Sequence, residues 1–168
     1  MARMLSLPGV DRLREAAPLV LRGSAGVIFA YHGYQKLDGG ISNFEGFVRQ
    51  LELPIPAVTA QVVTWLELVG GIMLILGLLT RAVSFLFVLE MIGTTAYVKL
   101  FKLEAGLIGS MGGPTGAEID IAQGAAALAL VLLGPGLLAL DGLLGIEPRR
   151  PSPTDSARPA PMSAGLQT

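Results

Sequence analysis

Four long apolar stretches constrain this chain more than any other feature of its sequence. They span residues 18–37, 58–79, 82–98 and 119–140. About 20 apolar residues suffice for a helix to cross the ~30 Å hydrocarbon core of a bilayer. Backbone groups in lipid must be hydrogen-bonded within the structure, which favours helices, and buried strands of soluble proteins run only about 4–8 residues. The pattern therefore predicts an all-α fold, an integral membrane four-helix bundle.

The composition supports this class and excludes others. Hydrophobic residues make up 52% of the chain and charged residues 15%, against roughly 25% charged in an average soluble domain. The net charge of -1 and the lack of a basic stripe argue against nucleic acid as a partner. The absence of cysteine excludes disulfides and thiolate-ligated metals, and we predict no metal site.

The apolar region divides the chain into three parts. Residues 1–17 lack the apolar core of a secretory signal peptide and are expected to form a cytoplasmic N-terminal segment. Residues 18–146 are expected to form the transmembrane domain. Residues 147–168 are rich in Pro and Ser and are expected to be a disordered cytoplasmic tail.

The connections between the apolar stretches differ in length. Only Thr80 and Arg81 separate the second stretch from the third, which predicts a tight antiparallel hairpin. The other two connections, 38–57 and 99–118, are long, and the first is expected to contain a short amphipathic helix around residues 43–53.

The distribution of Lys and Arg predicts the orientation. The side that holds both termini carries seven of these residues and the opposite side four, so the positive-inside rule places both termini in the cytoplasm. The lipid bilayer is thus an expected partner. The residues counted are Arg3, Arg12, Arg14, Arg81, Arg149, Arg150 and Arg158 on the first side, and Lys36, Arg49, Lys99 and Lys102 on the second.

Three ionisable residues lie within the apolar stretches. Glu67 and Glu90 fall near the middle of the second and third stretches, and Arg22 lies close to the start of the first. A lone charge at the centre of a bilayer costs at least ~2.5–3.5 kcal/mol, so these side chains are expected to face the interior. A guanidinium can hold a carboxylate through two hydrogen bonds, and we predict that Arg22 pairs with Glu67 or Glu90.

A second polar group is expected at the outer end of the bundle. His32 and Lys36 close the first stretch, and Glu118 and Asp120 open the fourth, so we predict that His32 and Lys36 face these carboxylates. An alternative remains open, because a terminal lysine and a histidine among tyrosines are also typical of headgroup anchors and interfacial belts. No catalytic residue is identified. The candidate buried polar or ligand-binding residues are Arg22, His32, Lys36, Glu67, Glu90, Glu118 and Asp120.

Three stretches of this sequence resemble the DoxX family of small four-helix bacterial membrane proteins, which includes DoxD-type quinone-linked subunits. The matching stretches are "LRGSAGVIFAYHGYQKL" (Arg22, Gly26, Phe29, His32, Gly33, Lys36, Leu37), "WLELVGGIMLILGLLTR" (Glu67, Gly70, Gly71, Gly77, Thr80, Arg81) and "LLGPGLLALDGLLG" (Gly134, Pro135, Gly136, Leu140, Asp141). The resemblance implies a multi-pass protein of the bacterial inner (plasma) membrane and a link to quinone and redox chemistry. The chain departs from the family where members often carry a further histidine after the third helix, and it has Ala139 where many have Ser.

Three classes of function follow. The first is a quinone-interacting or accessory subunit of a membrane-associated oxidoreductase. With no cysteine and one histidine the chain has no evident means of holding a haem or an iron–sulfur cluster, so a redox enzyme partner would supply the electrons. The second is a non-enzymatic scaffold or assembly factor, and the third a small transporter or lipid-binding module. No covalently bound cofactor is expected, quinone is the candidate ligand, and homo-oligomerisation is left open.

Overall fold

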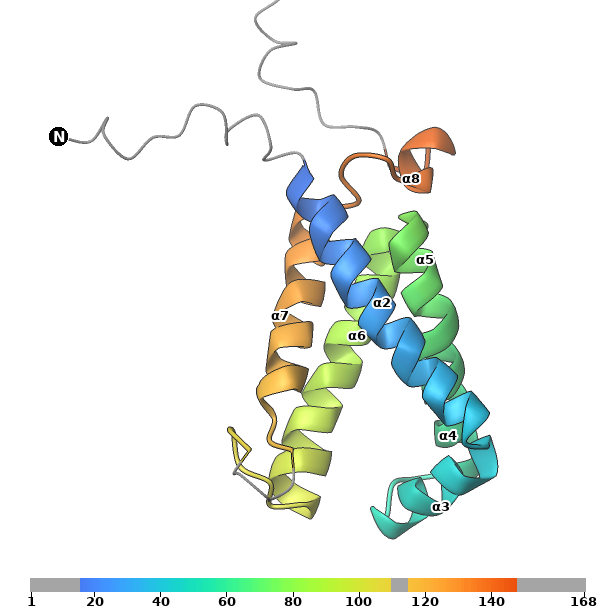
Figure 1. The fold of residues 1–168 in the computed structure, drawn as a ribbon, viewed down its shortest axis with the longest axis vertical. Helices are drawn as coiled ribbons and strands as arrows, with labels where there is room; N and C mark the ends of the chain where they lie inside the picture. Colours follow the sequence, from blue (N-terminus) through green and yellow to red (C-terminus); the bar gives the residue numbers. More distant parts are fainter. Residues whose placement is uncertain (1–15, 110–114, 148–168) are drawn as a thin grey trace, which may run out of the picture.

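The computed structural model describes residues 16–109 and 115–147, and every regular element in these residues is helical. The predicted all-α fold is confirmed for this part of the chain (Figure 1). The elements are α2 (Ala17–Asp38), α3 (Ile41–Gln50), α4 (Pro56–Trp65), the π-helix η3 (Leu66–Gly70), α5 (Gly71–Leu76), α6 (Thr80–Gly93), the π-helix η4 (Thr94–Lys102), α7 (Glu118–Leu133) and α8 (Leu140–Leu143).

Successive elements join into longer rods. α4, η3 and α5 form one continuous rod, Pro56–Leu76, and α6 and η4 form another, Thr80–Lys102. By length and composition both rods are able to cross a membrane. The number of four membrane crossings and the cytoplasmic placement of both termini stay predictions, and the expected N-terminal segment and Pro-rich tail fall almost entirely outside the described residues.

Two helix ends differ from those predicted. The fourth apolar stretch was expected to be helical to residue 140, but α7 ends at Leu133, because Gly134 has a φ of 84° and Pro135 follows it. The hairpin turn was expected at Thr80 and Arg81, but it lies at residues 77–79, where Gly77 adopts a φ of 68°, and α6 begins at Thr80. Glycine adopts this left-handed conformation without steric cost, so it ends the helix.

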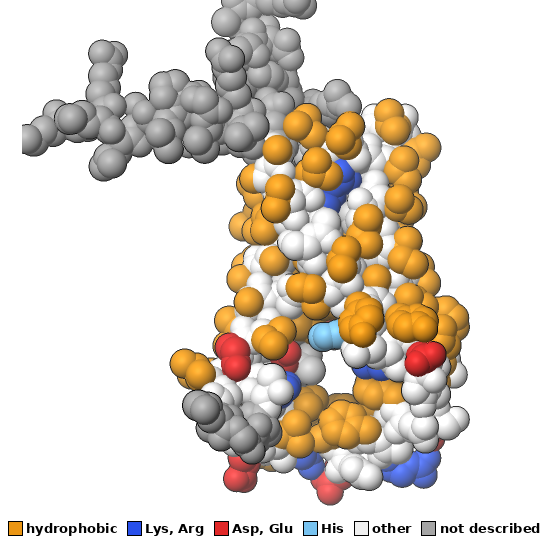
Figure 2. Space-filling view, viewed as in Figure 1, with side chains coloured by type: hydrophobic (Ala, Val, Ile, Leu, Met, Phe, Trp, Pro, Cys, Tyr) orange, Lys and Arg blue, Asp and Glu red, His pale blue; other side chains and the backbone are white. Residues whose placement is uncertain are grey.

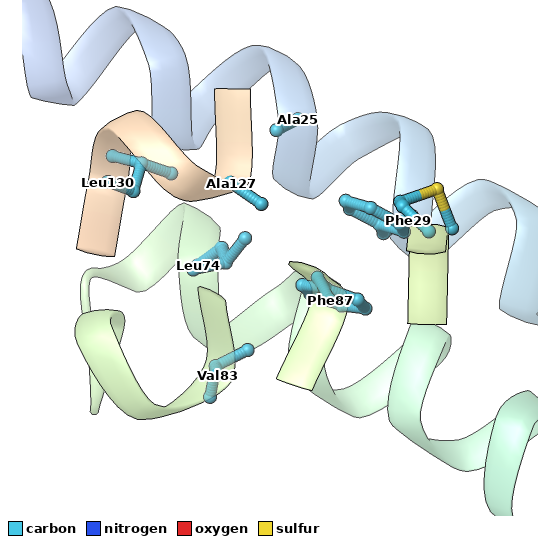
Figure 3. Packing of buried hydrophobic residues seen from close by; sticks show 8 residues of the cluster. Ala25, Phe29, Leu74, Val83, Phe87, Ala127 and Leu130 are labelled. Carbon is cyan, nitrogen blue, oxygen red and sulfur yellow. The ribbon is translucent and has the colours of Figure 1, made fainter. Parts of the chain in front are cut away.

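The core lies where α2, α5, α6 and α7 meet. The rings of Phe29 and Phe87 stack with centroids 3.7 Å apart and an interplanar angle of 7°. Side chains from all four helices pack against this pair, with Leu74 from α5 and Ala127 and Leu130 from α7 (Figure 3). The buried cluster comprises Ala25, Phe29, Leu74, Val83, Phe87, Met91, Ala127 and Leu130.

Small residues let α2 approach the 56–76 rod closely. A Cβ atom added at Gly33 would overlap the backbone of Leu68, and one added at Gly71 would overlap the backbone of Ala30. On the opposite side of the rod, a Cβ at Gly70 would lie 3.0 Å from the ring of Phe87. The paired glycines therefore serve two interfaces: Gly71 faces α2, and Gly70 faces α6. Contacts of this kind through small residues are typical of helices packed within a membrane.

The outer faces of the helices are apolar. Exposed hydrophobic side chains occur on α2, on both rods and on α7, among them Val20, Val62, Ile92 and Leu132, each more than half exposed. In Figure 2 hydrophobic side chains spread over most of this face, and charged side chains gather mainly at its lower end. So continuous an apolar surface is expected of a protein that contacts lipid.

Candidate functional site

A partly buried ion pair joins α2 to η3, near the end of α2 that lies low in Figure 1. The Lys36 ammonium donates to Glu67 Oε2, and Glu67 is 4% exposed. The same ammonium lies 5.1 Å from the centroid of the Phe44 ring. The predicted pairing of Arg22 with Glu67 or Glu90 is therefore wrong, since Lys36 rather than Arg22 compensates Glu67. We call this end of the molecule the Lys36 end.

The backbone of η3 helps to direct Glu67 inward. Glu67 and Gly70 are the buried residues of this π-helical turn. A π turn widens the helix locally and changes the direction in which the next side chains point, and such turns are frequent at functional sites. The close contact of α2 with Leu68 brings Lys36 to the same level.

Glu90 of α6 lies beside this ion pair. The charges of Glu67, Lys36 and Asp120 all act on it, and its Oε2 atom is buried without a hydrogen-bond partner in the described part of the chain. The contact between Gly70 and Phe87 explains the placement, because Glu67 and Glu90 each lie about one helical turn further toward the Lys36 end. The structure thus brings together the two glutamates that the sequence places in the middle of the apolar stretches.

Asp120 and His32 extend the group toward the surface. The charges of Lys99, His32 and Glu118 act on Asp120, whose Oδ2 atom is buried and has no partner among the described residues. The prediction that His32 and Lys36 both face the carboxylates of the fourth stretch therefore has a different outcome for each residue. His32 lies within electrostatic range of Asp120, whereas Lys36 bonds to Glu67.

Glu118 does not belong to this buried group. It is exposed, and both its carboxylate oxygens accept from the Gly109 amide, at 3.2 and 3.3 Å. Its observed contact fastens the loop before α7 to the start of that helix.

An open groove lies over the ion pair. Its volume is about 360 Å³. His32 and Lys36 supply nitrogen donors, Phe44 supplies an aromatic face, and the other lining residues are small or uncharged. In Figure 2 the one histidine of the chain borders a hollow near the lower end, with charged side chains beside it. The lining residues are His32, Gln35, Lys36, Gly39, Gly40, Asn43 and Phe44.

Arg22 lies far from this groove, at the opposite end of α2. It is 1% exposed, and its Nη2 atom donates to the carbonyl oxygens of Leu137 and Leu138, at 2.6 and 2.7 Å. Asp141 lies near enough for its charge to act on Arg22. The carboxylate of Asp141 accepts from the amides of Leu79 and Thr80, at 2.6 and 2.9 Å, and so satisfies donors at the start of α6.

Sequence reasoning missed Asp141 as a site of contact and used it only as part of a matching motif. The available signal was an aspartate within an otherwise apolar stretch, "LLALDGLLG". It also missed Arg81, which pairs with Glu147 and donates to the carbonyl oxygens of Val131 and Leu132 at the end of α7. We call the contacts made by Arg22, Arg81 and Asp141 the Arg22-end fastening.

A third missed contact spans the Lys36 end. Lys102, the last residue of η4, donates to Glu52 at 2.5 Å and also lies 5.7 Å from the centroids of the Tyr97 and Phe101 rings. Glu52 follows α3, so the contact links α3 to the 80–102 rod. The hydrogen bond and the positive charge of Lys102 lower the pKa of Glu52 below its ordinary value.

Comparison with known proteins identifies the relatives of this chain. A family model described as DoxX matches residues 17–100. The protein named "Putative oxidoreductase CatD" from Bacillus subtilis (strain 168) is 36% identical over 129 residues, which cover 76% of this chain and 86% of that protein. "Inner membrane protein YphA" from Escherichia coli (strain K12) is 27% identical over 133 residues, covering 76% of this chain and 90% of that protein. No solved structure matches significantly.

Proposed function

Because this chain belongs to the DoxX family of membrane proteins, we propose that it is a quinone-interacting subunit of a membrane-associated oxidoreductase complex. The observation that carries the proposal is the groove of about 360 Å³ with Lys36, His32 and Phe44 on its walls. Small-molecule pockets are typically about 300–1,000 Å³ and combine apolar surface with a few well-placed polar groups. The name of the Bacillus subtilis relative supports a redox role, and the Escherichia coli relative is named an inner membrane protein.

In this proposal the four helical stretches cross the bacterial plasma membrane, with both termini in the cytoplasm and the Lys36 end outside. The 56–76 rod and the 80–102 rod have the required length and composition. α2 spans 22 residues and α7 spans 16, which is close to the length a helix needs to cross. The excess of Lys and Arg on the side of the termini supports the orientation.

The groove residues fit a quinone head group. A quinone presents two carbonyl oxygens that accept hydrogen bonds, and a quinone takes up two electrons and two protons when it is reduced. Lys36 and His32 would donate to the carbonyl oxygens, and the ring of Phe44 would lie against the head group. Glu67 holds the Lys36 ammonium in place from behind. A redox partner protein would deliver the electrons, since the chain has no cysteine and a single histidine.

A second candidate function, a non-enzymatic membrane scaffold, is favoured by a separate observation. Arg22 and Glu118 make contacts that hold segments of the chain together, and neither lines the groove. In a scaffold the Lys36–Glu67 pair would likewise serve only to position α2 against η3, alone or in a homo-oligomer.

Extraction of bound quinone from the protein purified in mild detergent separates the two. We expect stoichiometric quinone in the wild-type protein and loss of most of it in Lys36→Ala and His32→Ala. Arg49→Ala is the matched control, because Arg49 is a basic residue at the same end that is exposed and does not line the groove. A folded wild-type protein that carries lipid but no quinone would contradict the quinone proposal and favour the scaffold.

A further inference from the structure

Three carboxyl groups from three different helical segments converge at the Lys36 end. Glu67 comes from η3, Glu90 from α6 and Asp120 from α7. The packing places them together independently of their charges. Gly70 contacts Phe87 about one turn from the two glutamates, and a Cβ at Gly124 would lie 3.2 Å from the side chain of Met91, one turn from Asp120 and next to Glu90.

The three carboxyl groups outnumber the cations that contact them directly in the described part of the chain. Among residues 16–109 and 115–147, Lys36 is the one cation in direct contact with them, and it bonds to Glu67. His32 and Lys99 act on Asp120 from the surface side. Glu90 therefore lies between two other carboxyl groups. Glu67 is already paired with Lys36, and Asp120 is acted on by His32 and Lys99 at the surface. An uncompensated charge in the hydrocarbon region is costly, so a proton held on Glu90 stabilises the group as a whole.

Three of the buried polar atoms that lack a partner among the described residues lie in this region, and the others are on Arg22, Thr80 and Ser84. Glu90 Oε2 and Asp120 Oδ2 are buried without partners in the described structure. Gln123 is 9% exposed, lies one turn from Asp120 on the buried face of α7, and its Nε2 donor has no partner within the described residues. Donors and acceptors without a fixed partner allow hydrogen bonds to change when a proton moves.

We propose that Glu90 holds an exchangeable proton and passes it between Asp120 and the Lys36–Glu67 pair beneath the groove. The step moves one proton and no electron. Lys36 gives a proton to an oxygen of the ligand in the groove and regains one through Glu67 from Glu90. Glu90 is then reprotonated from Asp120, which takes its proton from the surface beside His32 and Lys99. The identity of the acceptor as a quinone rests on the proposed function, whereas the proton site itself does not.

Infrared spectroscopy of the full-length protein in lipid nanodiscs, without added quinone, tests this proposal. We expect a carbonyl-stretch band of a protonated carboxyl group at neutral pH, which shifts on exchange into D2O and is lost in Glu90→Gln. Glu118→Gln is the matched control, because Glu118 is exposed and bonded to the loop, and it should leave the band unchanged. Asp120→Asn should keep the band and slow its shift in D2O.

The absence of the band from the wild-type protein would overturn the proposal, and so would a band that persists in Glu90→Gln. An Asp120→Asn variant that exchanges as fast as wild type would overturn the path through Asp120. The wild-type spectrum decides the first point even if a variant fails to fold. Quinone extraction from the same samples separates the two proposals: a band without quinone leaves the proton site standing alone, and quinone without a band leaves only the quinone site.

Discussion

Arg22 and Lys36 lie 14 residues apart on the same face of α2, yet they serve opposite ends of the molecule. At ~1.5 Å per residue their Cα atoms are separated by about 21 Å along the helix. Lys36 compensates Glu67, and Arg22 binds carbonyl oxygens near Asp141. That Glu67 would be buried and would need a partner followed from its place in an apolar stretch. Which cation pairs with it depends on the tilt and rotation of α2 against η3, and the sequence alone does not specify these.

Asp141→Ala should destabilise the protein by at least about 2 kcal/mol. The change removes the acceptor of two amides at the start of α6, and it removes the negative charge of Asp141 that acts on the buried Arg22. Unfolding in detergent, followed by circular dichroism, measures the difference. Asp38→Ala is the control, because Asp38 is an exposed carboxylate at the far end of α2. Equal stability of Asp141→Ala and wild type would show that the fastening contributes little.

At the scale of elements, sequence patterns located the helices better than their ends. The first apolar stretch, 18–37, matches α2 to within one residue at each end. The turn at 77–79 and the end of α7 at Leu133 were missed, because hydrophobicity continues past the point where Gly77 and Gly134 adopt positive φ angles. The short helix expected at 43–53 lies instead at Ile41–Gln50. Hydropathy reports burial in lipid or protein, whereas helix ends depend on backbone conformation.

The close contact of α2 with the 56–76 rod predicts opposite effects for two glycine substitutions on the same helix. Gly33→Ala should destabilise the protein by about 1–3 kcal/mol, because the new methyl group overlaps the backbone of Leu68. Gly23→Ala should be neutral or stabilise by about 0.5–1 kcal/mol, because nothing lies within 4 Å of its Cβ position and alanine favours a helix over glycine. Unfolding of both variants in detergent measures the contrast. Similar effects at the two positions would contradict the close helix contact.

At the scale of the whole molecule, the two ends are held in different ways. The Arg22-end fastening joins α2, α6 and α7 to the segment 134–147 through buried or half-buried groups. At the Lys36 end the carboxyl groups converge beneath an open groove, and the exposed contact of Lys102 with Glu52 links α3 to the 80–102 rod. The sequence indicated polar groups at both ends. It did not indicate which end is closed, because the fastening uses carbonyl oxygens that every residue carries.

The Glu52–Lys102 contact should make the spacing between α3 and the 80–102 rod depend on pH. Since the pKa of Glu52 is lowered in the folded protein, the contact is present at and above the ordinary glutamate range and is lost as the pH falls through the lowered pKa. The distance between spin labels at Phe47→Cys and Leu100→Cys should therefore lengthen or broaden in acid. The chain has no native cysteine, so the labels attach only at these positions.

Glu52→Lys should produce the same broadening at neutral pH, because two like charges replace the pair. Glu104→Lys is the matched control, since Glu104 is an exposed glutamate near Lys102 that forms no ion pair with any described residue. Distances that stay unchanged both in acid and in Glu52→Lys would show that the contact does not hold α3 to the rod.

The contact between Asp141 and the start of α6 can form only late in synthesis of the chain. The ribosome makes the chain from its N-terminus, and Asp141 follows Thr80 by 61 positions. At about 5–20 residues per second, α6 waits roughly 3–12 seconds for the carboxylate that satisfies its first amides. During that interval the first helices are already long enough to enter the bilayer, while Arg22 and the amides of Leu79 and Thr80 lack their partners. A nascent chain released before residue 141 would carry nearly all of the apolar sequence without this contact.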